Sequence, residues 1–306
     1  MRVAIIGGTG FVGSYIVDEL LLQGHEVSML VRKGSEKKLI QPDSTRMVAG
    51  SIDSTASIDE VVAGCDAVIY CVGILREFPR QGITYEATQY DGVASTIEAA
   101  TKGGVQRFIL MSANGVKIPG TRYQETKKRA EDALLESKLE ATIFRPSVVF
   151  GDPRGQMEFA TQLYRDMVHK PIPAIGFFSG LNPGTGAVLM SPVHVEDVAR
   201  AFVNSLSDAS TLGKTYNLGG PEVVSWPEMI RRIAAATGRR KWIIPFPIGV
   251  MKLAATLLDW LPLFPVTRDQ LTMLAEGNTA DPKVIESLTG KAPIAFSPEH
   301  LAYLNG

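Results

Sequence analysis

Cysteine and histidine are scarce in this chain of 306 residues, which has two cysteines and four histidines. The histidines are scattered and no CxxC pair occurs, so the sequence contains no recognisable zinc-binding pattern. Cys65 and Cys71 lie around a predicted buried strand, and a disulfide between them would distort that strand. We therefore expect two reduced, buried thiols and no bound metal.

An excess of charge of either sign is also lacking, since the formal net charge is −1 at pH 7. This balance does not favour binding to DNA, RNA or an anionic membrane, so the expected partner is a small molecule. A hydrophobic content of 45% together with 29 glycines is ordinary for an α/β enzyme and excludes a disordered chain. The oligomeric state and the identity of the substrate stay open.

Long hydrophobic runs are missing as well. The most apolar stretch, residues 242–264, contains Lys252 and Asp259 and is broken by three prolines, which makes it a poor membrane span. Residues 243–264 form either the core of a small lobe or a patch that docks on a membrane or a partner complex. Because a predicted strand begins at residue 2, there is no room for a leader peptide. We expect a cytoplasmic protein, with the inner face of a membrane as the alternative location.

Apolar segments rich in β-branched residues alternate with segments of helical periodicity through the first half of the chain. Strands are predicted at 2–6, 25–31, 67–72, 106–111 and 141–150, and helices at 12–22, 58–63, 91–101 and 123–137. Such alternation requires parallel pairing through right-handed crossovers. We therefore predict an α/β fold, with a doubly wound parallel Rossmann sheet and a smaller, helix-rich C-terminal substrate lobe.

The pattern loosens after residue 151, where strands are predicted at 188–194 and 215–218 and helices at 196–205 and 225–238, the last capped by Ser225. We assign residues 1–152 plus about 188–222 to the dinucleotide-binding domain, and residues 153–187 and 223–306 to the smaller lobe. Residues 152–154 and the loop 180–186 either line the substrate cleft or are ordinary loops. His194 is interpreted as a hydrogen-bonded structural residue rather than as an acid or base.

A glycine-rich loop joins the first predicted strand to the first predicted helix. In this pattern Gly7 permits a tight turn, Gly10 lets the backbone approach a pyrophosphate, and Gly13 lets the helix pack close to the strand. The start of the helix then offers free N–H groups and a positive dipole end to the phosphates. The predicted cofactor contacts here are Gly7, Thr9, Gly10, Phe11, Val12 and Gly13. The alternative is a Rossmann fold that no longer binds its ligand.

The end of the second predicted strand indicates which nicotinamide cofactor is bound. An NAD-specific site places an acidic residue there, and this chain has none. Arg32 and Lys33, followed by Ser35, suit the 2′-phosphate of NADP(H), so NADP(H) is the preferred cofactor and NAD(H) the alternative. The same two cations also fit an ordinary solvated turn. After the third predicted strand, Ser51 and Asp53 are further candidate contacts, with Asp53 at the adenine amino group.

Tyr123 and Lys127 lie four positions apart, on one face of a predicted helix. A phenol is a weak acid near neutral pH, and a neighbouring ammonium group favours its phenolate form. The pair can therefore pass a proton to or from a substrate oxygen while a hydride moves at the nicotinamide, and Lys127 can also hold the nicotinamide ribose. Ser112, at the end of the preceding predicted strand, is the third candidate catalytic residue.

Together these motifs resemble the extended and atypical short-chain dehydrogenase/reductases, a superfamily that includes the NAD-dependent epimerases and dehydratases. The matching segments are Gly7–Gly13, Gly50–Asp53, Cys71–Gly73, Phe108–Ser112, Tyr123 with Lys127, Arg145–Gly151, Pro192–Ala199 and Tyr216–Gly220. The resemblance implies further cofactor contacts at Cys71, Val72, Gly73, Met111, Ser112, Tyr123, Lys127, Pro146, Ser147 and Val148. For residues 146–148 the alternative is ordinary strand termination. Ala113 stands where extended members carry a Ser or Thr that binds the substrate carbonyl, which weakens the case for a reductase.

Three shorter segments are similar to the NAD(P)H-binding accessory subunits of respiratory complex I and their bacterial relatives: Val72–Arg76, Pro245–Pro247 and Thr267–Asp269. In such proteins the fold and the cofactor site are kept, while catalysis is in doubt. Our first hypothesis is an NADP(H)-dependent oxidoreductase acting on an unidentified carbonyl or alcohol. The second is a cofactor-binding structural, assembly or redox-sensing protein of a respiratory or other membrane complex. A nucleotide-sugar epimerase or dehydratase with retained NAD is a further alternative, against which Arg32 argues.

Overall fold

The structure is a computed structural model that describes residues 1–39, 41–179, 186–251 and 268–305. It consists of two compact units. The first comprises Met1–Pro146, Val195–Asn217 and Ser287–Gly290, and the second comprises Ser147–His194, Leu218–Glu286 and Lys291–Gly306. The chain thus leaves the first unit after Pro146 and returns to it at Val195, a shorter returning segment than the 188–222 predicted from the sequence.

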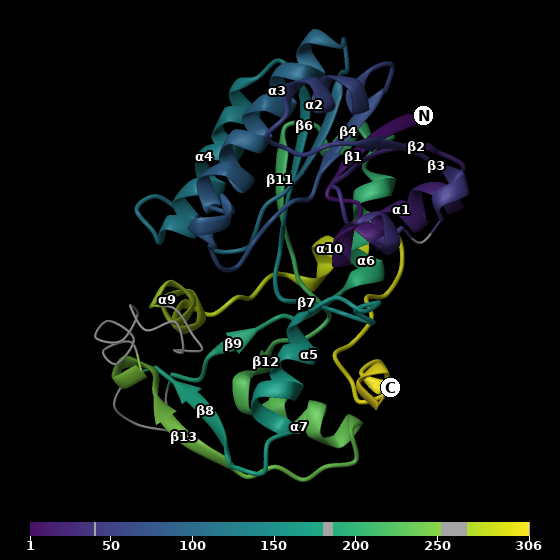
Figure 1. Ribbon diagram of the computed structural model, residues 1–306. Helices are drawn as coiled ribbons and strands as arrows, with labels where there is room; N and C mark the ends of the chain where they lie inside the picture. Colours follow the sequence, from purple (N-terminus) through teal and green to yellow (C-terminus); the bar gives the residue numbers. More distant parts are fainter. Residues whose placement is uncertain (40, 180–185, 252–267, 306) are drawn as a thin grey trace. The chain divides into compact units, whose positions relative to one another are not determined.

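A seven-stranded sheet forms the centre of the first unit, with the strand order β11-β6-β5-β4-β1-β2-β3 (Figure 1). The strands are β1 (Arg2–Ile6), β2 (Glu26–Val31), β3 (Thr45–Ala49), β4 (Ala67–Tyr70), β5 (Arg107–Met111), β6 (Glu140–Pro146) and β11 (Lys214–Leu218). Each adjacent pair from β6 to β3 is parallel. The strand order reverses between β1 and β4, and ligands of such sheets bind beyond the carboxyl ends of the strands at this reversal.

Helices cover both faces of this sheet. They are α1 (Phe11–Leu22), α2 (Thr55–Val62), α3 (Gly92–Lys102), α4 (Arg122–Glu136) and α6 (Val195–Asn204). Helices α2, α3 and α4 lie on one side, and α1 and α6, which pack against each other, lie on the other (Figure 1). Residues Val3 to Ile6 of β1 are fully buried, as expected of a strand covered on both faces. The predicted doubly wound α/β fold is confirmed.

The second unit combines short paired strands with a helical core. Strand β8 (Ala174–Phe178) runs parallel to β13 (Ile243–Pro247), β7 (Val149–Phe150) parallel to β10 (Val193–His194), and β9 (Leu189–Met190) antiparallel to β12 (Val224–Ser225). The helices are α5 (Phe159–Leu163), α7 (Trp226–Ala236), α9 (Arg268–Glu276) and the first part of α10 (Pro282–Thr289). As predicted, Ser225 caps α7, and its hydroxyl accepts a hydrogen bond from the N–H of Glu228 at 3.4 Å.

Two predicted strands are each divided in the structure. Residues 141–150 form β6 and then β7, because the chain changes its partner from β5 to β10 after Pro146. Residues 188–194 form β9 and β10, separated by Pro192, which has no N–H for strand pairing. Most of the predicted loop 180–186 and of the apolar stretch 243–264 lies outside the described residues, and so does Thr267. Among the residues that are described, no helix is long and apolar enough to cross a membrane.

Arg107 is a buried cation that joins four parts of the first unit. Its guanidinium donates hydrogen bonds to the carbonyl of Glu140 at 2.6 Å, the hydroxyl of Thr142 at 2.7 Å, the carbonyl of Ser205 at 2.8 Å and the hydroxyl of Thr211 at 2.9 Å. These bonds connect β5 and β6 to the end of α6 and to the segment before β11.

Replacing Arg107 by methionine should destabilise the protein, because it leaves buried acceptors without their donor. We expect Arg107→Met to lower the free energy of unfolding by about 2–4 kcal/mol, measured by urea denaturation. Arg46→Met is the control, since Arg46 is exposed on β3 and makes one long hydrogen bond, of 3.4 Å, to the Glu60 carbonyl. Equal, small losses in the two variants would show that the buried bonds contribute little.

Candidate functional site

The loop after β1 has no space for a side chain at two of its glycines. Gly7 has a φ of +102°, a conformation that favours glycine. A Cβ on Gly7 would lie 2.9 Å from the backbone of Cys71 and Val72, just beyond β4. A Cβ on Gly13 would lie 2.1 Å from the carbonyl oxygen of Gly7, so the first turn of α1 packs directly on the loop. This geometry agrees with the roles predicted for Gly7 and Gly13.

The start of α1 has the open N-terminus that phosphate binding requires. Gly10 is the N-cap, and within the described residues no side chain caps the helix; its first turn contains no acidic residue. The N–H of Gly10 donates to the Gly7 carbonyl at 3.0 Å, which closes the loop. Thr9, Phe11 and Val12 are half-buried around this helix start. The loop therefore fits a pyrophosphate group on both steric and electrostatic grounds.

The turn after β2 presents two cations and no carboxylate. Arg32 and Lys33 are exposed, and Ser35 is buried, with its N–H donating to the Arg32 carbonyl at 2.9 Å. After β3, the carboxylate of Asp53 accepts a hydrogen bond of 2.8 Å from the hydroxyl of Ser51. These two residues form a local pair ahead of α2, and a contact between Asp53 and adenine stays a prediction.

Tyr123 and Lys127 lie together in the first half of α4. Thr121 and Gln124 form a capping box at the start of this helix, which fixes where its first turn begins. The ring of Tyr123 is buried edge-on against the ring of Tyr85, with centroids 5.6 Å apart. The Nζ atom of Lys127 lies 5.8 Å from the centroid of the Tyr123 ring and donates a hydrogen bond of 3.2 Å to the Met111 carbonyl at the end of β5.

Burial dominates the electrostatics of this pair. It lowers the pKa of Lys127 to about 8, and the nearby carboxylate of Glu131 partly offsets this effect. Glu131 is itself buried and ion-paired with Arg145, whose Nε donates to it at 2.7 Å. Burial raises the pKa of Tyr123 above its ordinary value, and the neighbouring Tyr85 adds to this shift. In this structure desolvation outweighs the effect expected of the Lys127 ammonium group, so the phenol of Tyr123 stays protonated near neutral pH, as a proton donor must be.

Ser112 faces the protein interior beside Lys127. Its hydroxyl is buried and has no hydrogen-bond partner among the residues that the structure describes. Ser112, Met111, Val72, Lys127 and Gln89 line a narrow gap that has no room for a water molecule. The amide of Gln89 donates to the Ile74 carbonyl at 2.9 Å, which holds it at this gap.

Cys71 and Gly73 follow β4 beneath the glycine loop. The N–H of Cys71 donates to the Ile6 carbonyl at 2.9 Å, and its thiol lies 3.4 Å from the same oxygen. Burial raises the pKa of this thiol to about 12, which makes it unreactive. Cys65 and Cys71 are both free and buried, so the prediction of two reduced, packed thiols is confirmed. A Cβ on the exposed Gly73 would lie 3.7 Å from Nζ of Lys127, so this residue borders the Tyr123–Lys127 pair.

Residues 146–148 divide between the two units. The carbonyl of Pro146 accepts a hydrogen bond from the N–H of Asn114 at 3.0 Å within the first unit. In the second unit, the hydroxyl of Ser147 donates to the Asn278 carbonyl at 2.8 Å, and Val148 packs against the apolar core. Cofactor contacts from these residues stay predictions. His194 is also buried in the second unit, with its ring edge-on to Phe150 at 5.0 Å, which agrees with its interpretation as a structural residue.

Sequence reasoning missed four residues around the Tyr123–Lys127 pair. Glu131 could have been found, because it lies four positions after Lys127 on the same helix face. Tyr85 and Gln89 come from a segment, part of it the π-helix Glu86–Asp91, that gave no recognisable motif. Arg145 was read only as part of a family segment, and its pairing with Glu131 depends on tertiary structure.

Comparison with known proteins places this chain among nicotinamide-binding proteins. Residues 7–171 match a family model described as NAD(P)H-binding. The mitochondrial NADH dehydrogenase (ubiquinone) 1 alpha subcomplex subunit 9 of Arabidopsis thaliana is 30% identical over 293 residues, which cover 90% of this chain and 68% of that protein. A ceramide reductase of Caulobacter vibrioides is 27% identical over 269 residues, covering 84% and 77%. The solved structure of Thermus thermophilus UDP-glucose 4-epimerase with NAD shares the fold, with a TM-score of 0.72, 19% identity, and 100% and 98% of the two chains covered.

Substituting Gly13 should damage the cofactor site. The added Cβ of Gly13→Ala would meet the Gly7 carbonyl and force the loop to move. With roughly 1–3 kcal/mol of backbone strain, we expect the affinity for NADPH and NADH to fall roughly 5- to 150-fold, measured by fluorescence titration. Gly249→Ala is the control, because a Cβ there meets no atom within 4 Å. Unchanged affinity in a folded Gly13→Ala variant would contradict phosphate binding by this loop.

Proposed function

Because the chain belongs to the NAD(P)H-binding family, we propose that it is an NADP(H)-dependent oxidoreductase of the atypical short-chain type, acting on a carbonyl or alcohol group of a small molecule. The observation that carries this proposal is the burial of Tyr123 and Lys127 side by side on α4, with Lys127 bonded to the end of β5. The relative named ceramide reductase supports reductase chemistry in a chain of this kind.

In the proposed reaction Tyr123 is the proton donor. Burial raises the pKa of its phenol, so the group is protonated and acts as an acid when a substrate oxygen gains negative charge. Lys127 is an ammonium ion below a pH of about 8, and its charge stabilises the phenolate that forms as the proton leaves. NADPH, when bound, supplies the hydride. Gly7, Gly10 and Gly13 would hold its pyrophosphate at the start of α1.

Arg32 and Lys33 select NADP(H) over NAD(H) in this proposal. Both side chains are exposed at the end of β2, where an NAD-specific site would have a carboxylate for the ribose hydroxyls. A guanidinium group binds a phosphate through two parallel hydrogen bonds, so Arg32 is suited to the 2′-phosphate. NAD(H) lacks this phosphate and would gain no such contact from Arg32.

The cofactor preference can be measured by titrating the purified protein with NADPH and NADH at the same salt concentration. Charge-assisted hydrogen bonds to the 2′-phosphate are worth ~1.5–3 kcal/mol, so NADPH should bind roughly 10- to 150-fold more tightly. Arg32→Ala with Lys33→Ala should remove this preference and leave the NADH affinity unchanged. Lys37→Ala with Lys38→Ala is the matched control, because these exposed cations lie on the next turn, Glu36–Lys38. Equal or tighter binding of NADH by the wild-type protein would refute the preference and favour an epimerase with retained NAD.

A second candidate function is that of a cofactor-binding structural, assembly or redox-sensing protein of a respiratory or other membrane complex. The buried hydroxyl of Ser112 favours it, because this group lines an interior gap, and Ala113 follows where a substrate-binding hydroxyl is usual. A reductase that lacks such a donor is typically slower by about 10²–10³. The relative named as a subunit of NADH dehydrogenase supports this alternative.

Tyr123→Phe separates the two candidate functions. If Tyr123 is the acid, this change should lower turnover of carbonyl compounds by about 10²–10⁴ and leave NADPH affinity unchanged. Tyr85→Phe is the matched control, since its hydroxyl is bonded to the Leu75 carbonyl. If Tyr123→Phe alters no activity with NADPH, the second candidate takes precedence.

The rate of the wild-type enzyme should fall as the pH rises through about 8, because Lys127 then loses its proton.

A further inference from the structure

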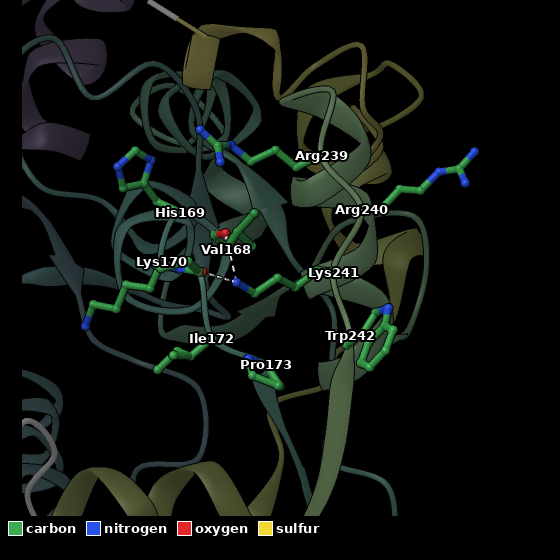
Figure 2. Close-up of a pocket in the computed structure, with 10 residues that line it drawn as sticks. Val168, His169, Lys170, Ile172, Pro173, Arg239, Arg240, Lys241 and Trp242 are labelled. Carbon is green, nitrogen blue, oxygen red and sulfur yellow. Dashed lines mark hydrogen bonds between the residues drawn. The ribbon is translucent and has the colours of Figure 1, made fainter.

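A pocket in the second unit lies between two loops that are far apart in the sequence (Figure 2). One loop, residues 169–173, follows the π-helix η5 (Tyr164–Val168) and leads into β8. The other, residues 239–242, follows α7 and leads into β13. The hollow has a volume of about 410 Å³, which is enough for a phospholipid headgroup.

The lining of this pocket is strongly cationic. Lys170, Arg239, Arg240 and Lys241 belong to it, and no acidic residue does. Acidic groups on the neighbouring helices already have partners. The carboxylate of Asp166 is paired with Arg165, and that of Glu228 with Arg231 and Arg232. The four cations of the pocket therefore form a local positive site on a chain whose net charge is −1.

Lys241 joins the two loops into a preformed site. Its Nζ donates hydrogen bonds to the carbonyls of Val168, at 3.1 Å, and of Lys170, as Figure 2 shows. The N–H of Ala174 donates to the Trp242 carbonyl at 2.8 Å, which ties the start of β8 to the start of β13. Burial and the neighbouring Arg239 both lower the pKa of Lys241. A bound anion would relieve the repulsion among these cations.

Large apolar side chains surround the same pocket. Trp242 is 83% exposed and Ile172 61% exposed, and both line it. Ile244, which lies two positions beyond Trp242 and within β13, is 55% exposed. A site for a free phosphate ion needs no exposed indole ring. Tryptophan and cationic side chains together are typical of surfaces at the boundary between lipid headgroups and acyl chains.

We propose that this pocket binds the phosphate groups of anionic phospholipids while Trp242 and Ile172 insert into the outer acyl region, so that the protein attaches to a negatively charged membrane surface. The proposal goes beyond the oxidoreductase function and does not depend on it. The proposed contact is centred on residues 169–173 and 239–242, and takes in only the start of the apolar stretch 243–264, where the sequence had suggested one. The net charge of the chain did not predict this membrane contact, because the four cations come together only in the folded protein.

Vesicle sedimentation of the full-length protein tests the charge requirement. We expect binding to vesicles of mixed phosphatidylglycerol and phosphatidylcholine, and none to phosphatidylcholine alone. Arg239→Ala with Arg240→Ala should weaken this binding roughly 30-fold. Lys37→Ala with Lys38→Ala removes the same charge from exposed positions of the first unit, outside the pocket, and is the control, expected to stay within about twofold of wild type. Equal losses in both double variants, or equal binding to the two kinds of vesicle, would overturn the proposal.

Tryptophan fluorescence locates the contact. Trp242 should shift to shorter wavelength on anionic vesicles, and Trp242→Phe should abolish the shift. Trp260→Phe should keep it, because Trp260 belongs to the apolar stretch 243–264. A shift lost only in Trp260→Phe would overturn the assignment to this pocket. Inorganic phosphate tests whether the ligand is a lipid or a soluble anion. Its binding in the pocket is measured as protection of Lys170 from acylation. If phosphate protects Lys170 and vesicles do not bind, the ligand is a soluble phosphate and the lipid proposal fails.

Discussion

The first turn of α1 lies so close to the loop after β1 that one side chain would separate them. A Cβ on Gly13 would come within 2.1 Å of the Gly7 carbonyl, and much of the first unit depends on this approach. It sets the distance of α1 from the sheet, and therefore where α1 meets α6 on that face. It also leaves the N-terminus of the helix, without any capping side chain among the described residues, directly above the carboxyl ends of β1 and β4. The close packing at Gly13 thus also determines the electrostatics of the loop, because the positive end of the helix dipole has no capping side chain among the described residues.

The buried lysine of α4 is the second determinant of the site. Lys127 is held by the Met111 carbonyl on one side and by the field of Glu131 on the other, and Glu131 is in turn paired with Arg145. This chain of contacts keeps a titratable ammonium group in the protein interior near neutral pH. Burial and the neighbouring Tyr85 raise the pKa of Tyr123, so its phenol stays neutral. Near neutral pH the site therefore holds a charged ammonium group, on Lys127, beside a neutral phenol, on Tyr123.

The sequence predicted those features that local pattern or steric necessity determines. Alternating strands and helices, the glycine loop and the Ser225 cap each depend on residues close together in the chain. Features that depend on distant partners were missed. The break between β6 and β7 arises because β7 pairs with β10, and Arg107 looks like a surface residue until Ser205 and Thr211 are brought to it. The sequence indicated the charge beside Tyr123 but not the degree of its burial, which outweighs that charge and raises the pKa of the phenol.

The path of the chain through the first unit also bears on how such a protein can be divided or can evolve. Residues 147–194 leave and return between β6 and α6, so they amount to an insertion within the Rossmann unit. A fragment ending at Pro146 would contain the glycine loop and the Tyr123–Lys127 pair, yet it would lack the acceptors that Arg107 needs from residues 205 and 211. The nucleotide-binding half is thus not a separable module, whereas the inserted segment can change its length and composition while the register of the sheet stays the same. Diversity among relatives is accordingly expected to accumulate in the insertion, and the discontinuous sheet to be inherited as a whole.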